Sequence, residues 1–272
     1  MIAMVIVKGA RLLLIAVAAS YAILAALGPW LAPKLLYHPD YGSTRVPEGL
    51  RRLRGADGLE TLVVHLPHPG AAFTLWYFHG NAETLGDIEP LLREYHEAGF
   101  AVFAVEYPGY GLSPGQPSGA AIYAANRTAR AFFRDELKVP AAQTILVGHS
   151  LGGGSAVQLA TEEKVGGLVL QSAFTSAYEV MTRWPILPFD QYENRRKLRQ
   201  VSSPVLILHG DADDVISPRH GRSLFAATAE PKRALWVPGA GHNDLRFVAR
   251  KKYWDAFSAF RDLCARSSPR TP

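Results

Sequence analysis

The stretch Thr144-Ile145-Leu146-Val147-Gly148-His149-Ser150-Leu151-Gly152 decides the fold that we expect for this chain. It begins as an apolar strand, passes through a turn with a serine at its centre, and enters a helical pattern. The two glycines leave room for the backbone to turn sharply around the serine. A Gly-x-Ser-x-Gly turn between a strand and a helix is typical of a nucleophile elbow, which exposes the serine hydroxyl at the carboxyl edge of a parallel sheet. The other interpretation is an ordinary glycine-rich turn that carries a surface serine.

Short apolar runs alternate with helical patterns on both sides of this stretch. Seven runs are expected strands: Thr61–Leu66, Phe73–Phe78, Ala101–Glu106, Thr144–Val147, Gly167–Leu170, Val205–Leu208 and Ala234–Val237. Five segments are expected helices: Ile88–Ala98, Gly119–Leu137, Leu151–Thr161, Pro218–Ala229 and Asp244–Leu263. The runs that begin at positions 101, 144, 167 and 205 are almost continuously apolar, as in strands buried on both faces of a parallel sheet. The alternation predicts an α/β fold with a mostly parallel central sheet flanked by helices.

Two polar loops beyond the serine offer the partners that a serine nucleophile needs. A hydroxyl attacks a carbonyl efficiently when a histidine takes its proton and a carboxylate holds that histidine. On a sheet of this kind the acid follows the serine and the histidine comes last, each after a strand. The loop after Val205–Leu208 carries three aspartates, and the loop after Ala234–Val237 carries His242. We therefore predict Ser150 as the nucleophile and His242 as the general base.

The acid is one of Asp211, Asp213 and Asp214. Asp213 is the preferred candidate, because it lies four residues beyond His209 and deep enough in its loop to reach the ring of His242. The other two aspartates are expected to shape the turn. Two further interpretations stay open: His242 caps the helix that follows it, or His209 and the aspartates hold a metal ion.

Backbone amides are expected to stabilise the negative charge that develops on the substrate oxygen. Such an oxyanion hole needs two N–H donors. One donor is the amide of Leu151, the residue after the nucleophile. The second candidate is Asn81, in the loop His79-Gly80-Asn81-Ala82 that follows the strand Phe73–Phe78. An ordinary Gly-Asn β-turn is the alternative for that loop.

One connection in the chain is long. About 34 residues separate the strand that ends at Leu170 from the strand that begins at Val205, and connections of this length are usually functional. We expect residues 172–203 to form a lid segment. Four apolar residues in it are candidates to line the substrate site, and they fit packing on the core equally well: Trp184, Ile186, Leu187 and Phe189.

Residues 1–33 form a separate apolar segment that carries only two charges, Lys8 and Arg11. A helix over this segment is long enough to cross the hydrocarbon core of a membrane. We expect a retained N-terminal membrane anchor; a cleaved signal peptide and a buried core helix are the alternatives. The pair Gly28-Pro29 is expected to break the helix, and Trp30 and Tyr37 suit the far membrane interface.

Residues 34–272 then form the catalytic domain, on a single-pass membrane protein. The charges on the two sides of the apolar segment give opposing signals for orientation, and we favour an extracytoplasmic catalytic domain. The whole chain has a net charge of +5, with basic clusters spread along it and no nucleic-acid-binding motif. We expect no nucleic-acid partner. The single cysteine, Cys264, excludes an intramolecular disulfide and a cysteine-rich zinc module.

Several motifs occur in an order that resembles one known family. They are His79-Gly80-Asn81-Ala82, Glu106-Tyr107-Pro108-Gly109-Tyr110-Gly111-x-Ser113, Gly148-His149-Ser150-Leu151-Gly152, Gln171-Ser172-Ala173-Phe174-Thr175-Ser176, Leu187-Pro188-Phe189-Asp190, His209-Gly210-x-x-Asp213-x-Val215-Ile216 and Gly241-His242-Asn243-Asp244. Together they resemble the membrane-anchored α/β-hydrolase-domain serine hydrolases related to the bud-emergence-type proteins and to serine aminopeptidases. The resemblance runs from about Leu35 to Phe260, and it departs from the family pattern at Gly154 and Ala173.

This resemblance implies an α/β-hydrolase fold and a Ser150–Asp213–His242 triad, with oxyanion donors at Asn81 and Leu151. It leaves the substrate open, because relatives act on acylated protein cysteines, on esters and lipids, or on peptides. The sequence shows neither a phosphate loop nor a dinucleotide fingerprint, so we expect no cofactor, and we expect no metal. We interpret the chain as a serine hydrolase of a carboxylic ester or thioester with a lipid-like acyl group. The alternatives are a peptidase or amidase on the same triad and a non-catalytic membrane scaffold. The oligomeric state stays unknown.

Overall fold

The computed structural model describes residues 2–55, 58–182 and 190–267. In these residues, strands form one sheet in the order β1-β2-β4-β3-β5-β6-β7-β8. The strands are β1 Leu50–Arg54, β2 Glu60–Leu66, β3 Thr74–Phe78, β4 Ala101–Val105, β5 Thr144–His149, β6 Gly167–Gln171, β7 Val205–Gly210 and β8 Lys232–Val237. Strand β2 runs antiparallel to both of its neighbours, β1 and β4. The six strands β3, β4, β5, β6, β7 and β8 are parallel to one another. This is the α/β-hydrolase fold, as the sequence predicted.

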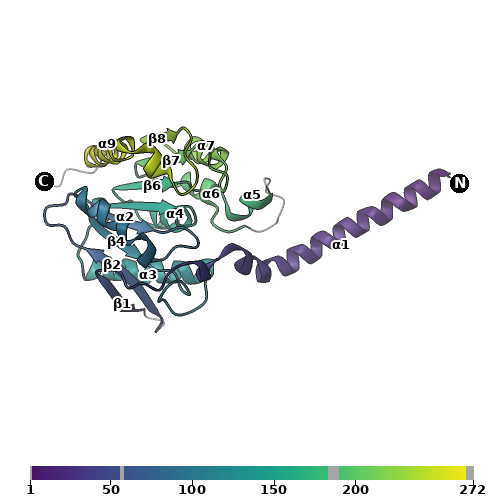
Figure 1. Ribbon diagram of the computed structural model, residues 1–272. Coiled ribbons are helices and arrows are strands. Elements are labelled where there is room, and N and C mark those ends of the chain that lie inside the picture. The colour runs from purple at the N-terminus through teal and green to yellow at the C-terminus, as the bar shows by residue number, and fades with distance from the viewer. Residues whose placement is uncertain (1, 56–57, 183–189, 268–272) are drawn as a thin grey trace.

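Helices cover both faces of the sheet (Figure 1). The helices of the described residues are α1 Ile2–Leu36, α2 Leu85–Glu97, α3 Gly119–Asp135, α4 Gly152–Glu162, α5 Ala177–Thr182, α6 Asn194–Leu198, α7 Pro218–Ala227, α8 Leu245–Ala249 and α9 Lys251–Ser267, with short 3₁₀ turns at Pro39–Tyr41 and Ala141–Gln143. Alternation along the strands decides which face each side chain joins. In β3, Leu75 and Tyr77 pack on one face, while Trp76 and Phe78 pack on the other.

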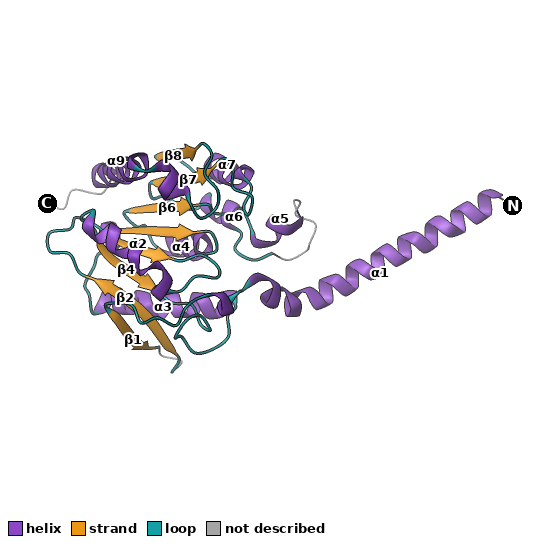
Figure 2. Cartoon of the chain, viewed as in Figure 1, coloured by secondary structure: helices purple, strands orange, loops and turns teal. Residues whose placement is uncertain are grey.

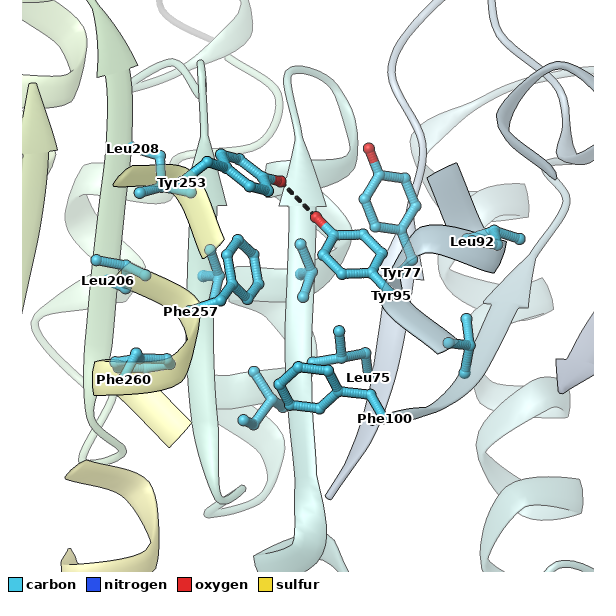
Figure 3. Packing of buried hydrophobic residues seen from close by; sticks show 14 of the residues in the cluster. Leu75, Tyr77, Leu92, Tyr95, Phe100, Leu206, Leu208, Tyr253, Phe257 and Phe260 are labelled. Carbon is cyan, nitrogen blue, oxygen red and sulfur yellow. Dashed lines mark hydrogen bonds between the residues drawn. The ribbon is translucent and has the colours of Figure 1, made fainter. Parts of the chain in front are cut away.

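The first face packs against α2, α8 and α9. Figure 3 shows this core, in which the Tyr95 and Tyr253 hydroxyls lie 2.5 Å apart and share a hydrogen bond. The second face packs against α3, α4, α6 and α7. Each fully buried Leu or Phe side chain contributes about 2 kcal/mol through removal of apolar surface from water, so the two layers hold the sheet rigid beneath its loops.

The two edge strands depart from the predicted set. Strand β1 was not expected, and β8 begins at Lys232 rather than Ala234. Both carry arginine or lysine side chains, because an edge strand has one unpaired side and charged residues there protect it from pairing with another chain. The helix expected over Asp244–Leu263 is divided into α8 and α9 at Arg250, whose φ is 50°.

Helix α1 projects away from the rest of the molecule (Figure 1). Its stretch Val7–Gly28 is 22 residues long, has no buried part, and is long and apolar enough to cross a membrane; signal sequences have the same properties. The predicted break at Gly28-Pro29 is wrong, since α1 continues to Leu36. A proline inside a helix removes one hydrogen bond and favours a bend without requiring that the helix end.

The placement predicted for Tyr37 at a membrane interface is also wrong. Tyr37 is 4% exposed and packs in a third apolar cluster, at the carboxyl edge of the sheet. The side chain of Trp30 lies outside the described residues.

Candidate active site

Ser150 lies in the turn between β5 and α4, in a backbone conformation that a serine rarely adopts. Its φ is +51°, and its N–H donates a 2.9 Å hydrogen bond to the carbonyl of Gln171 on the neighbouring strand. The flanking glycines make the turn possible. A Cβ on Gly148 would lie 2.6 Å from Gly153 Cα, and one on Gly152 would lie 2.1 Å from the Phe78 carbonyl oxygen. The packed sheet therefore holds a strained serine, which is a frequent feature of functional sites.

His242 and Asp213 reach Ser150 from the loops after β8 and β7. His242 Nε2 lies 3.0 Å from Ser150 Oγ, and His242 Nδ1 lies 2.9 Å from Asp213 Oδ2. All three side chains are buried. The structure therefore brings together the three residues predicted from the loop order, at hydrogen-bond distances from the carboxylate through the imidazole ring to the hydroxyl.

The environment of Asp213 keeps its carboxylate ionised. Burial alone would raise its pKa, but hydrogen bonds from His209 and His242 and from the Ile216 amide outweigh burial and hold the pKa of Asp213 well below its usual range. Its Oδ1 accepts hydrogen bonds from the amides of Val215 and Ile216, at 3.1 and 2.7 Å. A carboxylate fixed in this way favours the proton on the facing Nδ1 of His242 and leaves Nε2 free to accept a proton.

The two candidate oxyanion donors follow the carboxyl ends of two neighbouring parallel strands, β3 and β5. Strands β3 and β5 pair with Phe78 opposite Gly148, so the loop that contains Asn81 and the turn that contains Leu151 leave the sheet side by side. In the part of the chain that the structure describes, neither of these two amides donates a hydrogen bond to another protein group. Both amides are therefore free to bind an oxyanion.

A polar pair that the sequence analysis missed connects these loops. Glu83 Oε2 accepts a 2.7 Å hydrogen bond from the Gly80 amide and lies 3.2 Å from His149 Nδ1. Burial would raise the pKa of Glu83, but the charge and hydrogen bond of His149 and further bonds lower it to about 2. The ring of His149 lies 5.4 Å from that of His242. The position of His149 inside the elbow was a signal that a second polar contact lies behind the serine.

A second missed pair lies under the same loop. His79 Nε2 lies 2.8 Å from Glu106 Oε1, and both side chains are fully buried or nearly so. His79 Nδ1 lies 2.8 Å from the carbonyl oxygen of Gly80. Burial lowers the pKa of His79, but the charge and hydrogen bond of Glu106 outweigh it and raise that pKa. The motifs at positions 79–82 and 106–113 contain both residues, although nothing in their spacing along the chain predicts that they pair.

The four residues predicted to line the substrate site cannot be placed relative to the triad. Trp184, Ile186, Leu187 and Phe189 fall in residues 183–189, which are outside the described residues. The expected lid segment, 172–203, contains α5 and α6. Over the described ranges, no group of three or more His, Cys, Asp or Glu side chains is placed to hold a metal ion.

Comparisons with known proteins show similarity along most of the chain. A family model described as serine aminopeptidase, S33, matches residues 71–189. The alpha/beta hydrolase domain-containing protein aho-3 of Caenorhabditis elegans is 36% identical over 206 residues, which are 72% of this chain and 60% of that protein. An uncharacterized protein of Mycobacterium tuberculosis is 33% identical over 241 residues, which are 84% of this chain and 86% of that protein.

Human alpha/beta hydrolase domain-containing protein 17B is 34% identical over 185 residues, 67% of this chain and 64% of that protein. The match therefore spans less than two thirds of the length of these two alpha/beta hydrolase domain-containing relatives. Among solved structures, an esterase of Pyrococcus furiosus has a TM-score of 0.66 at 15% identity, with 79% of this chain and 91% of that one covered. A monoacylglycerol lipase of Paleococcus ferrophilus has a TM-score of 0.59 at 20% identity, with 77% and 100% covered. At these identities the likeness is one of fold.

Proposed function

This chain belongs to the α/β-hydrolase superfamily, and from that premise we propose that it hydrolyses carboxylic esters or thioesters with Ser150 as the nucleophile. The observation that carries the proposal is the line of contacts from Asp213 through His242 to Ser150 Oγ. A buried hydroxyl rarely faces a histidine that is itself held by an ionised carboxylate unless the proton on the hydroxyl is to be moved.

The geometry supports a two-step acyl transfer. Ser150 Oγ attacks the acyl carbon while its proton passes to His242 Nε2, and Asp213 stabilises the imidazolium that forms. The imidazolium then gives its proton to the leaving alcohol or thiol as the carbon–oxygen or carbon–sulfur bond breaks. Water attacks the acyl-enzyme with the same histidine as base, which releases the acid and restores the serine. The amides of Asn81 and Leu151 stabilise the oxyanion in both steps.

A lipid-like acyl group is the substrate class that we propose. The parallel strands, β5 among them, point in Figure 2 toward the side of the molecule from which α1 leaves, so Ser150 and its loops face the same side as the apolar helix. If α1 lies in a membrane, the reacting carbonyl is presented close to the lipid surface. The four apolar residues of the expected lid, Trp184, Ile186, Leu187 and Phe189, would then contact the acyl chain.

The membrane placement is part of the same proposal. We infer that residues 1–33 anchor the protein as a single span, with residues 34–272 as an extracytoplasmic catalytic domain. The supporting observation is a helix whose apolar side chains are exposed along Val7–Gly28, an arrangement that is unfavourable in water. Protease added to sealed inside-out and right-side-out vesicles distinguishes the two orientations, since it cleaves the catalytic domain on one face only.

A peptidase or amidase on the same three residues is the second candidate. It is favoured by one observation, the match of residues 71–189 to the serine aminopeptidase model. Amide cleavage differs from ester cleavage in needing a protonated amine as leaving group. Aminoacyl p-nitroanilides assayed beside p-nitrophenyl esters separate the two activities.

The test is hydrolysis of a p-nitrophenyl ester series, from acetate to octanoate and longer, by the purified full chain. We expect turnover that increases with acyl length, that is lost in Ser150→Ala, and that survives in Ser176→Ala. Ser176 is a matched control because its exposure, 8%, equals that of Ser150. A sharp preference for acetate would contradict the lipid-like substrate. Wild-type turnover in folded Ser150→Ala protein would contradict the nucleophile, and no turnover on any substrate would favour a scaffold.

A further inference from the structure

The end of α1 enters the candidate active site without an intervening linker. The Leu36 carbonyl accepts a 2.7 Å hydrogen bond from the side-chain amide of Asn81, and the His38 amide donates to the side-chain oxygen of Asn81 at 3.0 Å. Asn81 thus binds the chain on both sides of Tyr37. Its own backbone N–H is one of the two amides available to an oxyanion.

A tyrosine from the β4–α3 connection completes this contact. The Tyr110 hydroxyl donates to Asn81 Oδ1 at 2.6 Å and accepts from the His38 amide at 3.2 Å. The loop that carries Asn81 also contains Ala82 at a φ of +62°, a conformation that costs free energy in alanine. Side-chain contacts that fix this loop therefore oppose its relaxation.

Tyr37 itself is held on its other side. Its hydroxyl donates to Gln191 Oε1 at 3.0 Å and lies 2.9 Å from the hydroxyl of Tyr192. Its ring belongs to the same buried cluster as Leu151, the second candidate oxyanion donor. The segment Leu36–His38, which we call the junction, thus binds the side chain of one candidate donor, Asn81, and shares a buried cluster with the other, Leu151.

Gly154 and Tyr192 show that the fold makes space for this contact. A Cβ on Gly154 would lie 2.1 Å from the Tyr192 ring, and Tyr192 has a φ of +55°. Gly154 is one of the two positions at which the sequence departs from the family pattern. A glycine in α4 lets the ring approach closely enough for its hydroxyl to reach Tyr37.

We propose that the junction is a positioning element of the oxyanion hole, so that the end of the N-terminal apolar helix sets the geometry at Asn81 and Leu151. The inference rests on the proposed function, because it assigns these two amides to the reaction. It goes further in making Tyr37, Tyr110 and the side chain of Asn81 positioning residues for catalysis. In this proposal, a displacement of the end of the apolar helix would displace the loops that carry Asn81 and Leu151.

The test compares point variants of the full chain in detergent micelles, with p-nitrophenyl butyrate as substrate and a trifluoromethyl ketone as an inhibitor that forms a tetrahedral oxyanion. The variants are Asn81→Ala, Tyr110→Phe, Tyr37→Phe and Gly154→Ala. The control is Tyr41→Phe, which removes the hydroxyl of a neighbouring tyrosine that is 78% exposed. If the ester is not a substrate, the rate of fluorophosphonate labelling at Ser150 replaces kcat, since that reaction uses the same oxyanion hole.

We expect kcat to fall roughly 10-fold to 100-fold in the four variants, as for small displacements of reacting groups, while KM changes less than about threefold. The inhibition constant of the ketone should rise in parallel with the loss of kcat, and the control should match the wild type. A purely structural role would instead lower the melting temperature without this parallel. Values of kcat within twofold of wild type in all four variants would overturn the inference, whereas Ser150-independent turnover would overturn the proposed function itself.

Discussion

Two of the histidine–carboxylate pairs at the carboxyl edge of the sheet, Asp213–His242 and Glu106–His79, differ in what the second ring nitrogen faces. In the Asp213–His242 pair, the far nitrogen of the ring faces the hydroxyl of Ser150. In the Glu106–His79 pair, the far nitrogen faces the carbonyl oxygen of Gly80. A carbonyl oxygen can only accept a hydrogen bond, whereas a hydroxyl can also donate one.

This difference assigns the Asp213–His242 pair to the proposed reaction and the Glu106–His79 pair to the stability of the fold. The ring of His79 lies between two acceptor oxygens, Glu106 Oε1 and the Gly80 carbonyl. Burial lowers the pKa of His79, but the charge and hydrogen bond of Glu106 outweigh burial and raise that pKa, so this arrangement favours the protonated ring over a ring that acts as a base. The ring of His242 lies between an acceptor and a hydroxyl, so one nitrogen stays free to act as a base. A buried pair of this composition therefore acts as a base only when the neighbouring group can give up a proton.

The largest expected effect comes from removing the base. In His242→Gln, kcat/KM for ester hydrolysis should fall by about 10⁴-fold or more, because the variant loses the proposed base that takes the proton of Ser150. The melting temperature should change by only a few degrees. Steady-state kinetics and thermal unfolding on one preparation check both parts, with His68→Gln as the control histidine. Retention of one tenth of the wild-type activity would contradict the role of His242.

Asp213→Asn should have the next largest effect. The amide cannot hold the proton on His242 Nδ1, so the ring loses the tautomer that accepts from Ser150, and kcat should fall about 10³-fold to 10⁴-fold with KM little changed. A matched substitution, Asp214→Asn, alters a neighbouring aspartate that we place outside the triad and should leave kcat within about twofold. If the two variants lost activity equally, Asp213 would not be the acid.

The buried structural pair should affect stability. Breaking it in Glu106→Gln should lower the free energy of unfolding by about 3 kcal/mol, while Glu48→Gln, which breaks an exposed pair with Arg93, should cost less than about 1 kcal/mol. The raised pKa of His79 means that its contribution is complete below the unfolded pKa of about 6.5 and is lost as the pH rises through the folded pKa. Urea unfolding at pH 6 and pH 9 should show the gap between wild type and Glu106→Gln narrowing at the higher pH. A gap that widened would show that the pair is not an imidazolium–carboxylate pair.

The last expected effect is a change in the pH dependence of stability, and it concerns His220, a buried histidine outside the proposed triad. Burial, reinforced by the charge of Arg219, lowers its pKa to about 4. A lowered histidine pKa contributes stability above the unfolded value of about 6.5 and loses it as the pH falls toward about 4. Thermal unfolding of His220→Gln should therefore depend less steeply on pH than that of the wild type between pH 6.5 and 4. Parallel curves would contradict this assignment.

Much of the fold follows from local pattern. The interior strands were predicted within two residues at each end, because strands buried on both faces are almost continuously apolar. Strand β1 was missed because three of its five residues, in the sequence Leu50-Arg51-Arg52-Leu53-Arg54, are arginines, so that it contains no apolar run. The division of the last helix at Arg250 depends on packing of α8 and α9, which periodicity does not report.

The candidate site also contains residues that the sequence could place and contacts that it could not. Ser150, Asp213 and His242 could be placed from loop order alone, because parallel strands bring their carboxyl ends to one edge. The pairs Glu106–His79 and Glu83–His149 could not, because each joins residues whose distance depends on the whole sheet. Tyr37 was misplaced because an aromatic residue after an apolar helix fits a membrane interface and a buried tertiary contact equally well by composition.

The proposed hydrolase activity depends most on an activated serine at position 150, and reaction of the full chain in membranes with a fluorophosphonate probe tests for that serine directly. We predict a labelled band at the mass of the chain that is kept in Ser176→Ala and lost in Ser150→Ala, with the adduct on the peptide that contains Ser150. Equal labelling of the Ser150→Ala protein, or no labelling of folded wild type, would contradict the account.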